Sequence, residues 1–329
     1  SVGIIGAGPG GLAAADMLRR AGVQVTVYDR YDRAGGLLTY GIPGFKLEKD
    51  IVMRRNKQLE DSGVTFVMNC EIGKDVSFAE LQAKHDALIV ATGVYKSRDL
   101  GGPGAGAKGI VKAIDYLTAS NRAANFGDTV AEFESGELNA SGKKVVVIGG
   151  GDTAMDCVRT AVRQGATSVK CLYRRDRANM PGSQRETQNA EEEGVQFEWL
   201  TAPKGFKGDA VEAVIVEKMR LGAPDASGRQ SPEVIEGSDY DEPADLVIKA
   251  LGFSPEDLPT LWDQPELEVT RWGTIKAEFT TGRTAMPGVY AIGDIVRGAS
   301  LVVWAIRDGR DCVEAILQDM NAKAAVAAE

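Results

Sequence analysis

The sequence predicts an α/β protein with two doubly wound domains of parallel strands, the second inserted in the first. A strand, a glycine-rich turn, a helix and a second strand follow one another from residue 1 and again from residue 144. Strand patterns that complete the first sheet return only near residue 288. We therefore expect residues 1–105 and 255–329 to form the first domain and residues 106–254 the second.

The first glycine-rich turn has the spacing of a dinucleotide-binding motif. The apolar run Val2–Ile5 leads into Gly6, Gly8 and Gly11, with Pro9 and Gly10 between them, and a helical pattern follows. The first glycine permits the tight turn, the second lets the backbone approach a pyrophosphate, and the third lets the helix pack closely on the strand. Free N–H groups at the helix start can bind phosphate. The pattern predicts a Rossmann-like three-layer unit.

An acidic residue follows the second strand of this unit. Asp29 lies 18 positions after Gly11 (29 − 11), where a carboxylate can accept hydrogen bonds from ribose hydroxyls. An acid at this position favours a free 2′-hydroxyl, as in FAD or NAD.

The second copy differs from the first at this position. Gly150, Gly151, Asp152 and Thr153 form its turn, and its second strand ends in Arg174–Arg175. A guanidinium fork can bind a 2′-phosphate, so the exchange of Asp for Arg predicts NADPH as the second nucleotide.

Two later segments belong to the first domain. Leu88–Ala91 is an apolar strand that ends in Thr92–Gly93, at the kind of strand end that faces a ligand crevice. Residues 288–292 form another strand, after which Asp294 can accept hydrogen bonds from the ribityl hydroxyls of FAD. A helix from about residue 300 to 320 would aim the N–H groups of Leu301–Val303 at a flavin carbonyl.

The second domain contains further strand patterns. Residues 211–216 and 246–251 are expected to be strands, and the Gly-, Pro-, Asp- and Ser-rich stretch 221–232 to be a hairpin connection. The polar insertion 127–142 suggests no function.

Composition excludes several kinds of function. The net charge of −9 argues against nucleic acid as a partner. No apolar run reaches the ~18 residues of a membrane span, and no signal peptide is evident, so we expect a cytoplasmic protein. Four scattered cysteines and the single His85 offer no metal site, disulfide framework or redox pair. A bound cofactor must therefore carry any redox chemistry, and we expect no catalytic side chain.

Four stretches resemble a known family: Tyr28–Arg30, Gly35–Pro43, Cys171–Glu186 and Arg297–Ile306. They are similar to the FAD/NADPH oxidoreductase part of the small (beta) subunit of bacterial NADPH-dependent glutamate synthase. Adrenodoxin reductase and the flavin part of dihydropyrimidine dehydrogenase are more distantly similar. The resemblance covers essentially the whole chain.

The motifs and the resemblance together imply two sets of cofactor contacts. The expected FAD contacts are Gly6, Gly8, Pro9, Gly10, Gly11, Asp29, Arg30, Gly36, Leu37, Ile72, Thr92, Gly93, Asp294, Leu301, Val302 and Val303. The expected NADPH contacts are Gly150, Gly151, Asp152, Thr153, Arg174, Arg175 and Glu186. Hydride would pass from NADPH to FAD, for glutamate biosynthesis.

The resemblance also implies partners. In this family an N-terminal iron–sulfur region precedes the first Rossmann strand and passes electrons to the large (alpha) subunit. Because the sequence starts at that strand, we expect it to be a fragment that carries out only the first step.

Other functions stay open. A stand-alone NADPH–ferredoxin-type reductase would use a soluble acceptor, and a non-catalytic flavin-binding assembly module would need only the glycine turns. A thioredoxin-reductase-like activity is disfavoured because there is no cysteine pair.

Overall fold

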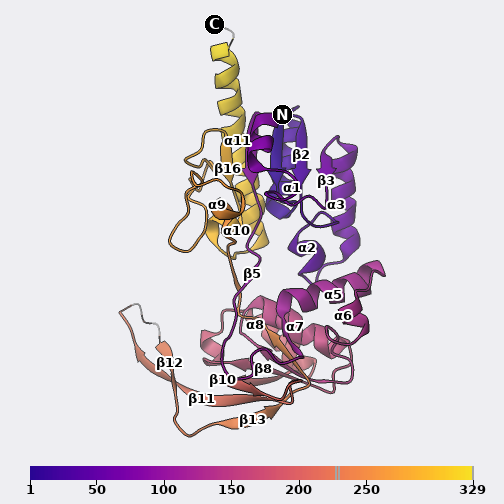
Figure 1. Cartoon of the computed structure of the whole chain (residues 1–329), viewed down its shortest axis with the longest axis vertical. Coiled ribbons are helices and arrows are strands. Elements are labelled where there is room, and N and C mark those ends of the chain that lie inside the picture. Colours follow the sequence, from indigo (N-terminus) through magenta and orange to yellow (C-terminus); the bar gives the residue numbers. More distant parts are fainter. Residues whose placement is uncertain (227, 229, 328–329) are drawn as a thin grey trace. The chain divides into compact units, whose positions relative to one another are not determined.

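The chain forms two compact units (Figure 1). The computed structural model describes residues 1–226, 228 and 230–327. Unit 1 comprises Ser1–Thr39, Leu47–Lys96 and Phe253–Glu329. Unit 2 comprises Tyr40–Lys46 and Ser97–Gly252.

Unit 1 is built on a sheet of five parallel strands in the order β16-β4-β1-β2-β3. The strands are β1 (Val2–Ile5), β2 (Val25–Tyr28), β3 (Thr65–Val67), β4 (Ala87–Val90) and β16 (Val289–Ala291). The carboxyl ends of all five therefore meet at one edge, and a ligand crevice in such sheets lies outside that edge.

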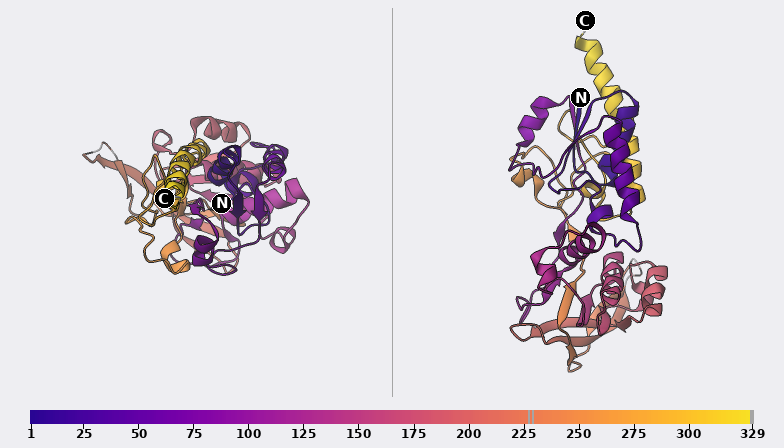
Figure 2. Two further views of the ribbon diagram at one scale, coloured as in Figure 1. Left: turned by 90° about the horizontal axis from the view of Figure 1, so that it is seen from above. Right: turned by 90° about the vertical axis from the view of Figure 1, so that its right-hand side faces the viewer.

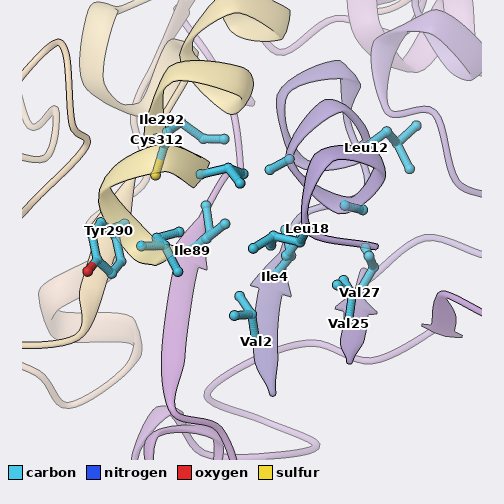
Figure 3. Packing of buried hydrophobic residues seen from close by; sticks show 14 of the residues in the cluster. Val2, Ile4, Leu12, Leu18, Val25, Val27, Ile89, Tyr290, Ile292 and Cys312 are labelled. Atoms are coloured by element: carbon cyan, nitrogen blue, oxygen red, sulfur yellow. The ribbon is translucent and has the colours of Figure 1, made fainter. Parts of the chain in front are cut away.

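The sheet is apolar on both faces, as a parallel sheet must be when helices and loops cover both sides. Ile4 belongs to the cluster that packs against α1 and α11, whereas its neighbour Ile5 belongs to the cluster on the opposite face. Figure 3 shows the first cluster, with Leu12 and Leu18 of α1 and Cys312 of α11 above the strands. The helices of unit 1 are α1 (Pro9–Arg20), α2 (Leu37–Tyr40, which continues into unit 2), α3 (Lys49–Asp61), α4 (Phe78–Lys84), α9 (Leu258–Leu261), α10 (Asp294–Arg297) and α11 (Val302–Ala327).

Helices α1 and α11 run side by side (Figures 1 and 2). Their close contact requires a glycine at position 309, in the third turn of α11. A Cβ on Gly309 would lie 2.3 Å from the carbonyl oxygen of Gly10 and 3.1 Å from the nitrogen of Ala14. The glycine is therefore kept for packing, at a cost in helix propensity.

Unit 2 repeats this sheet. Its five parallel strands have the order β6-β14-β7-β8-β9. The strands are β6 (Ile110–Lys112), β7 (Lys144–Ile148), β8 (Ser168–Tyr173), β9 (Gln196–Trp199) and β14 (Leu246–Lys249). One face packs against helices, and the helical elements of unit 2 are α5 (Ala113–Phe126), α6 (Ala131–Glu134), α7 (Asp152–Arg163), the 3₁₀ turn η1 (Arg177–Asn179) and α8 (Gln184–Glu192).

An antiparallel sheet covers the other face of unit 2. It consists of β10 (Thr201–Lys207), β11 (Ala213–Pro224), β12 (Gln230–Val234) and β13 (Tyr240–Pro243). The expected hairpin connection is thus shorter than 221–232, because Leu221 pairs with Pro232 and Pro224 with Gln230. Positions 227 and 229 of that connection lie outside the described residues. The polar insertion 127–142 contributes α6 to unit 2.

Two short strands, β5 (Lys96–Ser97) and β15 (Phe253–Ser254), pair with each other where the chain passes between the units. A further hydrogen bond from Arg98 N–H to the carbonyl of Gly252 (3.0 Å) extends the pairing. We call β5 and β15 the ribbon.

The predicted fold class is confirmed: the molecule is α/β, with two Rossmann-like parallel sheets. None of the helices in the described ranges is both long and apolar enough to cross a membrane. All four cysteines are free, and Cys157, Cys171 and Cys312 are buried.

The crossing of α1 and α11 generates a stability prediction. Gly309→Ala gains about 1 kcal/mol of helix propensity, but a methyl group forced into a packed contact costs about 1–3 kcal/mol. We expect a net loss of about 1 kcal/mol, measured as a lower urea midpoint. Gly106→Ala is the control, because nothing lies within 4 Å of a Cβ at that position. A Gly309→Ala protein as stable as the wild type would contradict the packing role.

Candidate dinucleotide sites

A cavity of about 400 Å³ opens at the carboxyl edge of the unit 1 sheet. Its volume lies in the range of small-molecule and cofactor sites. Twelve of the expected FAD contacts line it: Gly6, Gly8, Pro9, Gly10, Asp29, Arg30, Leu37, Ile72, Thr92, Gly93, Asp294 and Val302.

The three glycines of the turn at the start of α1 have different roles. Gly6 has φ +112°, and a Cβ there would lie 2.3 Å from the carbonyl oxygen of Ala91. A Cβ on Gly11 would lie 2.1 Å from the carbonyl oxygen of Gly6. Gly8, in contrast, has an ordinary extended conformation (φ −76°, ψ 178°) and open space around its Cβ position. The middle glycine is therefore not required by the fold, and it leaves a bare cradle at a helix N-terminus, which suits a pyrophosphate.

Asp29 is held at the end of β2 by the same turn. Its carboxylate accepts hydrogen bonds from Ala7 N–H (2.6 Å) and Tyr31 N–H (2.8 Å). Burial raises the pKa of the Asp29 carboxyl, and the two N–H groups oppose that rise. Each oxygen keeps a lone pair for a hydroxyl, so the orientation suits a ribose.

The residue after β4 and Ala91 carries a buried polar group. Thr92 Oγ1 makes no hydrogen bond with any residue that the structure describes. Because such atoms in folded proteins are nearly always satisfied, this hydroxyl is available to a ligand in the cavity.

The carboxyl group of Asp294, at the start of α10, lies in surroundings that disfavour its charged form. Burial, together with the nearby Asp308 carboxylate, raises the pKa of Asp294 to about 6, although Ser300 N–H opposes the rise. Asp308 itself is buried and paired with Arg297 at 2.6 and 2.7 Å.

In the first turn of α11, Val302 and Ala305 line the cavity. Leu301 and Val303, which we expected to contact the flavin ring, are 60% and 62% exposed and do not line it. Gly11 and Gly36 are also outside the lining; a Cβ on Gly36 would lie 3.0 Å from the Cα of Gly8.

Sequence reasoning missed several side chains that line the cavity. Tyr31, Tyr95 and Glu256 surround Arg30, and Trp262 stacks on Phe78 (5.2 Å between ring centroids). Tyr31 and Tyr95 follow Asp29 and Thr92 within three residues, which is a local signal. Glu256 and Trp262 carry no such signal.

The turn of unit 2 has the same geometry as the turn of unit 1. Gly149 has φ +151°, and a Cβ there would lie 2.2 Å from the carbonyl oxygen of Ala250. Gly151 has φ −94° and ψ 176°, with open space around its Cβ position, as at Gly8. A Cβ on Gly150 would lie 2.4 Å from the ring of Tyr173.

The loop that precedes α8 is hydrogen-bonded to this second turn. Gly182 N–H donates to the carbonyl of Gly150 (2.9 Å), and Ser183 N–H donates to Asp152 Oδ1 (2.9 Å). Asp152, at the start of α7, is exposed, and Thr153, which follows it, is half-buried.

The two arginines after β8 differ in their surroundings. Arg174 is exposed and makes no hydrogen bond or ion pair with any described residue. Arg175 donates from Nη2 to Asn179 Oδ1 (2.9 Å), while its buried Nε has no partner. Both therefore keep donor groups for an anion.

Glu186, in contrast, is engaged by cations. It pairs with Arg159 (2.8 Å) and Lys46 (3.1 Å), which lower the pKa of its carboxyl although burial opposes them. Lys46 also pairs with Asp156 at 2.7 Å, and burial raises the pKa of Asp156 to about 6 despite that contact.

These features define the class of protein. Two parallel sheets each place an open glycine turn at a helix start, one followed by an acid and the other by free arginine donors. This is the architecture of oxidoreductases that bind two dinucleotides.

Comparisons with known proteins give the family. The pyridine nucleotide-disulphide oxidoreductase model matches residues 1–309. The chain is 65% identical over its whole length to a glutamate synthase (NADPH) small chain of Azospirillum brasilense, of which it covers 69%. It is 45% identical to the corresponding chain of Escherichia coli K12, with 96% of this chain and 68% of that one covered. The chain therefore belongs to the pyridine nucleotide-disulphide oxidoreductase family and, within it, to the glutamate synthase (NADPH) small chains.

A solved structure supports the fold. FprA of Mycobacterium tuberculosis, in complex with NADPH, matches with a TM-score of 0.81 at 22% identity, over 99% of this chain and 86% of that one. Family membership confirms the predicted class, an NADPH-dependent flavin oxidoreductase, and the predicted cofactor pair of FAD and NADPH. Which residues contact each cofactor stays a prediction.

The unequal roles of the turn glycines can be tested by adding one methyl group. Gly8→Ala leaves the fold unstrained but fills the cradle, so we expect weaker flavin binding by roughly tenfold or more (about 1.4 kcal/mol) with unchanged stability of the flavin-free protein. Flavin titration and urea unfolding measure the two effects. Gly11→Ala is the matched variant and should lose stability instead. If both variants lose only stability, Gly8 does not face the ligand.

The raised pKa of Asp294 predicts a pH-dependent cost in stability. Because the folded protein prefers the protonated acid, the contribution of Asp294 to the stability of the wild type should fall as the pH rises from about 4 to about 6. The full shift would correspond to about 3 kcal/mol, and solvent at the partly exposed carboxylate reduces this to about 1 kcal/mol. Flavin-free Asp294→Asn should therefore gain about 1 kcal/mol at pH 8 and nothing at pH 4. Urea unfolding at both pH values measures this, and an equal effect at both would refute it.

Proposed function

We propose that unit 1 binds FAD, that unit 2 binds NADPH, and that the protein passes electrons from NADPH through FAD to a further acceptor. One observation carries the proposal: two turns of the same geometry are followed by Asp29 in unit 1 and by Arg174 in unit 2. An acid repels a 2′-phosphate and accepts a hydrogen bond from a 2′-hydroxyl. Arginine attracts a 2′-phosphate and donates hydrogen bonds to it.

In unit 1 the open turn at Gly8 and the N–H groups at the start of α1 would hold the pyrophosphate of FAD. Asp29 would accept from the ribose, and the unsatisfied Thr92 hydroxyl would find its partner in the cofactor. Asp294 and the start of α11 at Val302 would hold the ribityl and ring end. Of the remaining predicted contacts, Gly11 and Gly36 lie beside the turn, Leu301 and Val303 lie outside the cavity, and the others line it.

In unit 2 the turn from Gly150 to Thr153 would hold the pyrophosphate of NADPH. Arg174 is free to reach the 2′-phosphate, and Arg175 offers its unpaired Nε. Glu186 would contact NADPH while it is ion-paired with Arg159, which holds its carboxylate in one orientation.

Bound FAD would supply the redox chemistry, as the acceptor of a hydride from NADPH. The residues of this chain contribute position and electrostatics: the turns orient the phosphates, and the apolar walls of the cavity exclude water. We assign no catalytic side chain and no metal site.

We propose the glutamate synthase large (alpha) subunit as partner, with electrons passing through an iron–sulfur region outside this chain. Support comes from the relatives, which are named as small chains of that enzyme.

A cytoplasmic location fits the four free cysteines, since cytosolic thiols stay reduced.

The nucleotide assignment predicts the effect of removing one arginine. A hydrogen bond to a charged group contributes about 1.5–3 kcal/mol, and solvent at the exposed Arg174 reduces it. Arg174→Ala should therefore lower kcat/KM for NADPH by roughly tenfold, with little change for NADH. The measurement is the rate of flavin reduction against the concentration of each nucleotide, with ferricyanide as terminal acceptor.

Arg177→Ala is the control, because Arg177 lies in the same loop but is paired with Glu191 at 2.8 and 2.9 Å. It should leave the preference between nucleotides unchanged. The proposal for unit 2 fails if the Arg174→Ala, Arg175→Ala double variant keeps the wild-type ratio of NADPH to NADH activity. The proposal for unit 1 fails if the protein takes up no flavin.

A further inference from the structure

Arg30 stands at the centre of a cluster that we call the clamp: Arg30, Tyr31, Tyr95 and Glu256. Arg30 Nη1 lies 2.9 Å from Glu256 Oε1, although the two residues are 226 positions apart. Its guanidinium carbon lies 5.5 Å from the ring centroid of Tyr31 and 5.2 Å from that of Tyr95. The two rings contact each other, with centroids 5.7 Å apart. All four residues line the unit 1 cavity.

The clamp is more than an exposed ion pair. The side chains of Arg30 and Glu256 are only 31% and 28% exposed. Burial disfavours the charge on Arg30, but the Glu256 carboxylate more than offsets this and the pKa of Arg30 is raised. A planar guanidinium beside two aromatic rings, with one edge on a carboxylate, uses contacts that an ammonium group cannot make.

The position of the clamp in the chain is informative. Tyr95 immediately precedes β5, and Glu256 follows β15 by two residues. Arg30 follows Asp29 at the end of β2. The clamp therefore joins the polar end of the cavity to both strands of the ribbon, where the chain leaves unit 1 and returns to it.

We propose that Arg30 is a positioning residue that couples occupancy of the unit 1 cavity to the order of the ribbon. The inference rests on the proposed function, in which FAD fills this cavity. A ligand there displaces water from beside the Arg30–Glu256 pair, which strengthens the attraction between the two charges. A ligand that binds the clamped form more tightly also shifts the population toward it. The ribbon then opens less often in the flavin-bound protein than in the flavin-free protein.

Hydrogen exchange of backbone amides tests the coupling. In the wild-type chain, saturating FAD should slow exchange in residues 95–98 and 252–256 by about tenfold or more. The same experiment reports on residues 6–11, where FAD should protect the glycine turn directly. Visible absorbance establishes saturation.

Two variants separate the clamp from flavin binding. Arg30→Lys keeps the charge but loses the planar fork, and Glu256→Gln keeps the size but loses the charge. In Glu256→Gln, saturating FAD should still protect residues 6–11, whereas protection of the ribbon falls severalfold. Arg30 is itself an expected FAD contact, so Arg30→Lys is compared only at the FAD concentration that saturates it, where ribbon protection should fall in the same way. Arg283→Lys is the matched control, because Arg283 forms a comparably exposed pair with Asp319 (2.8 and 2.9 Å) and does not line the cavity. It should behave as the wild type.

The outcomes are distinct. Protection of the turn with no protection of the ribbon in the wild type overturns the coupling and leaves FAD binding in place. Equal ribbon protection in the wild type and both clamp variants also overturns it. No flavin uptake and no protection of residues 6–11 in the wild type would refute the proposed function itself. If Arg30→Lys does not fold, Glu256→Gln alone decides, since it removes the ion pair without touching the rings.

Discussion

The contact on which both sites depend is the one between the first turn glycine and the neighbouring strand. Gly6 lies against the carbonyl of Ala91 after β4, and Gly149 lies against the carbonyl of Ala250 after β14. Neither position has room for a Cβ. Because the turn is pressed onto the next strand, the following helix starts directly above the carboxyl edge of the sheet. Its free N–H groups and the strand-end residues then face the same space.

What local spacing encodes could be predicted from the sequence. Asp29 and Arg174 were predicted because each follows a strand at a defined distance from a glycine turn, and the structure places each at that strand end. Thr92 and Asp294 were predicted for the same reason, as residues that follow buried strands.

What depends on contacts between distant segments could not be predicted. Arg30 donates a hydrogen bond to Glu256, which lies 226 positions later in the chain, and no pattern in either segment predicts this pair. Residues 40–46 belong to unit 2 because Lys46 pairs with Asp156 and Asn121 Nδ2 donates to the carbonyl of Tyr40 (3.1 Å). Leu301 and Val303 show a further limit of the sequence. It predicts that a helix starts at their position, but which of the first residues faces the cavity depends on how α11 crosses α1.

The placement of the cysteines has a consequence for survival in the presence of oxygen. Flavin chemistry in air generates peroxide, and a thiol is attacked in proportion to its thiolate fraction and its exposure. Burial raises the pKa of Cys171 to about 12 and also raises the pKa of Cys157 and Cys312. At neutral pH these three are therefore almost entirely protonated and out of reach. Cys70 lines the cavity and is half-buried, and burial raises its pKa as well. Thiol oxidation in this chain would thus begin at Cys70 in the unit 1 cavity, while the three buried thiols stay intact.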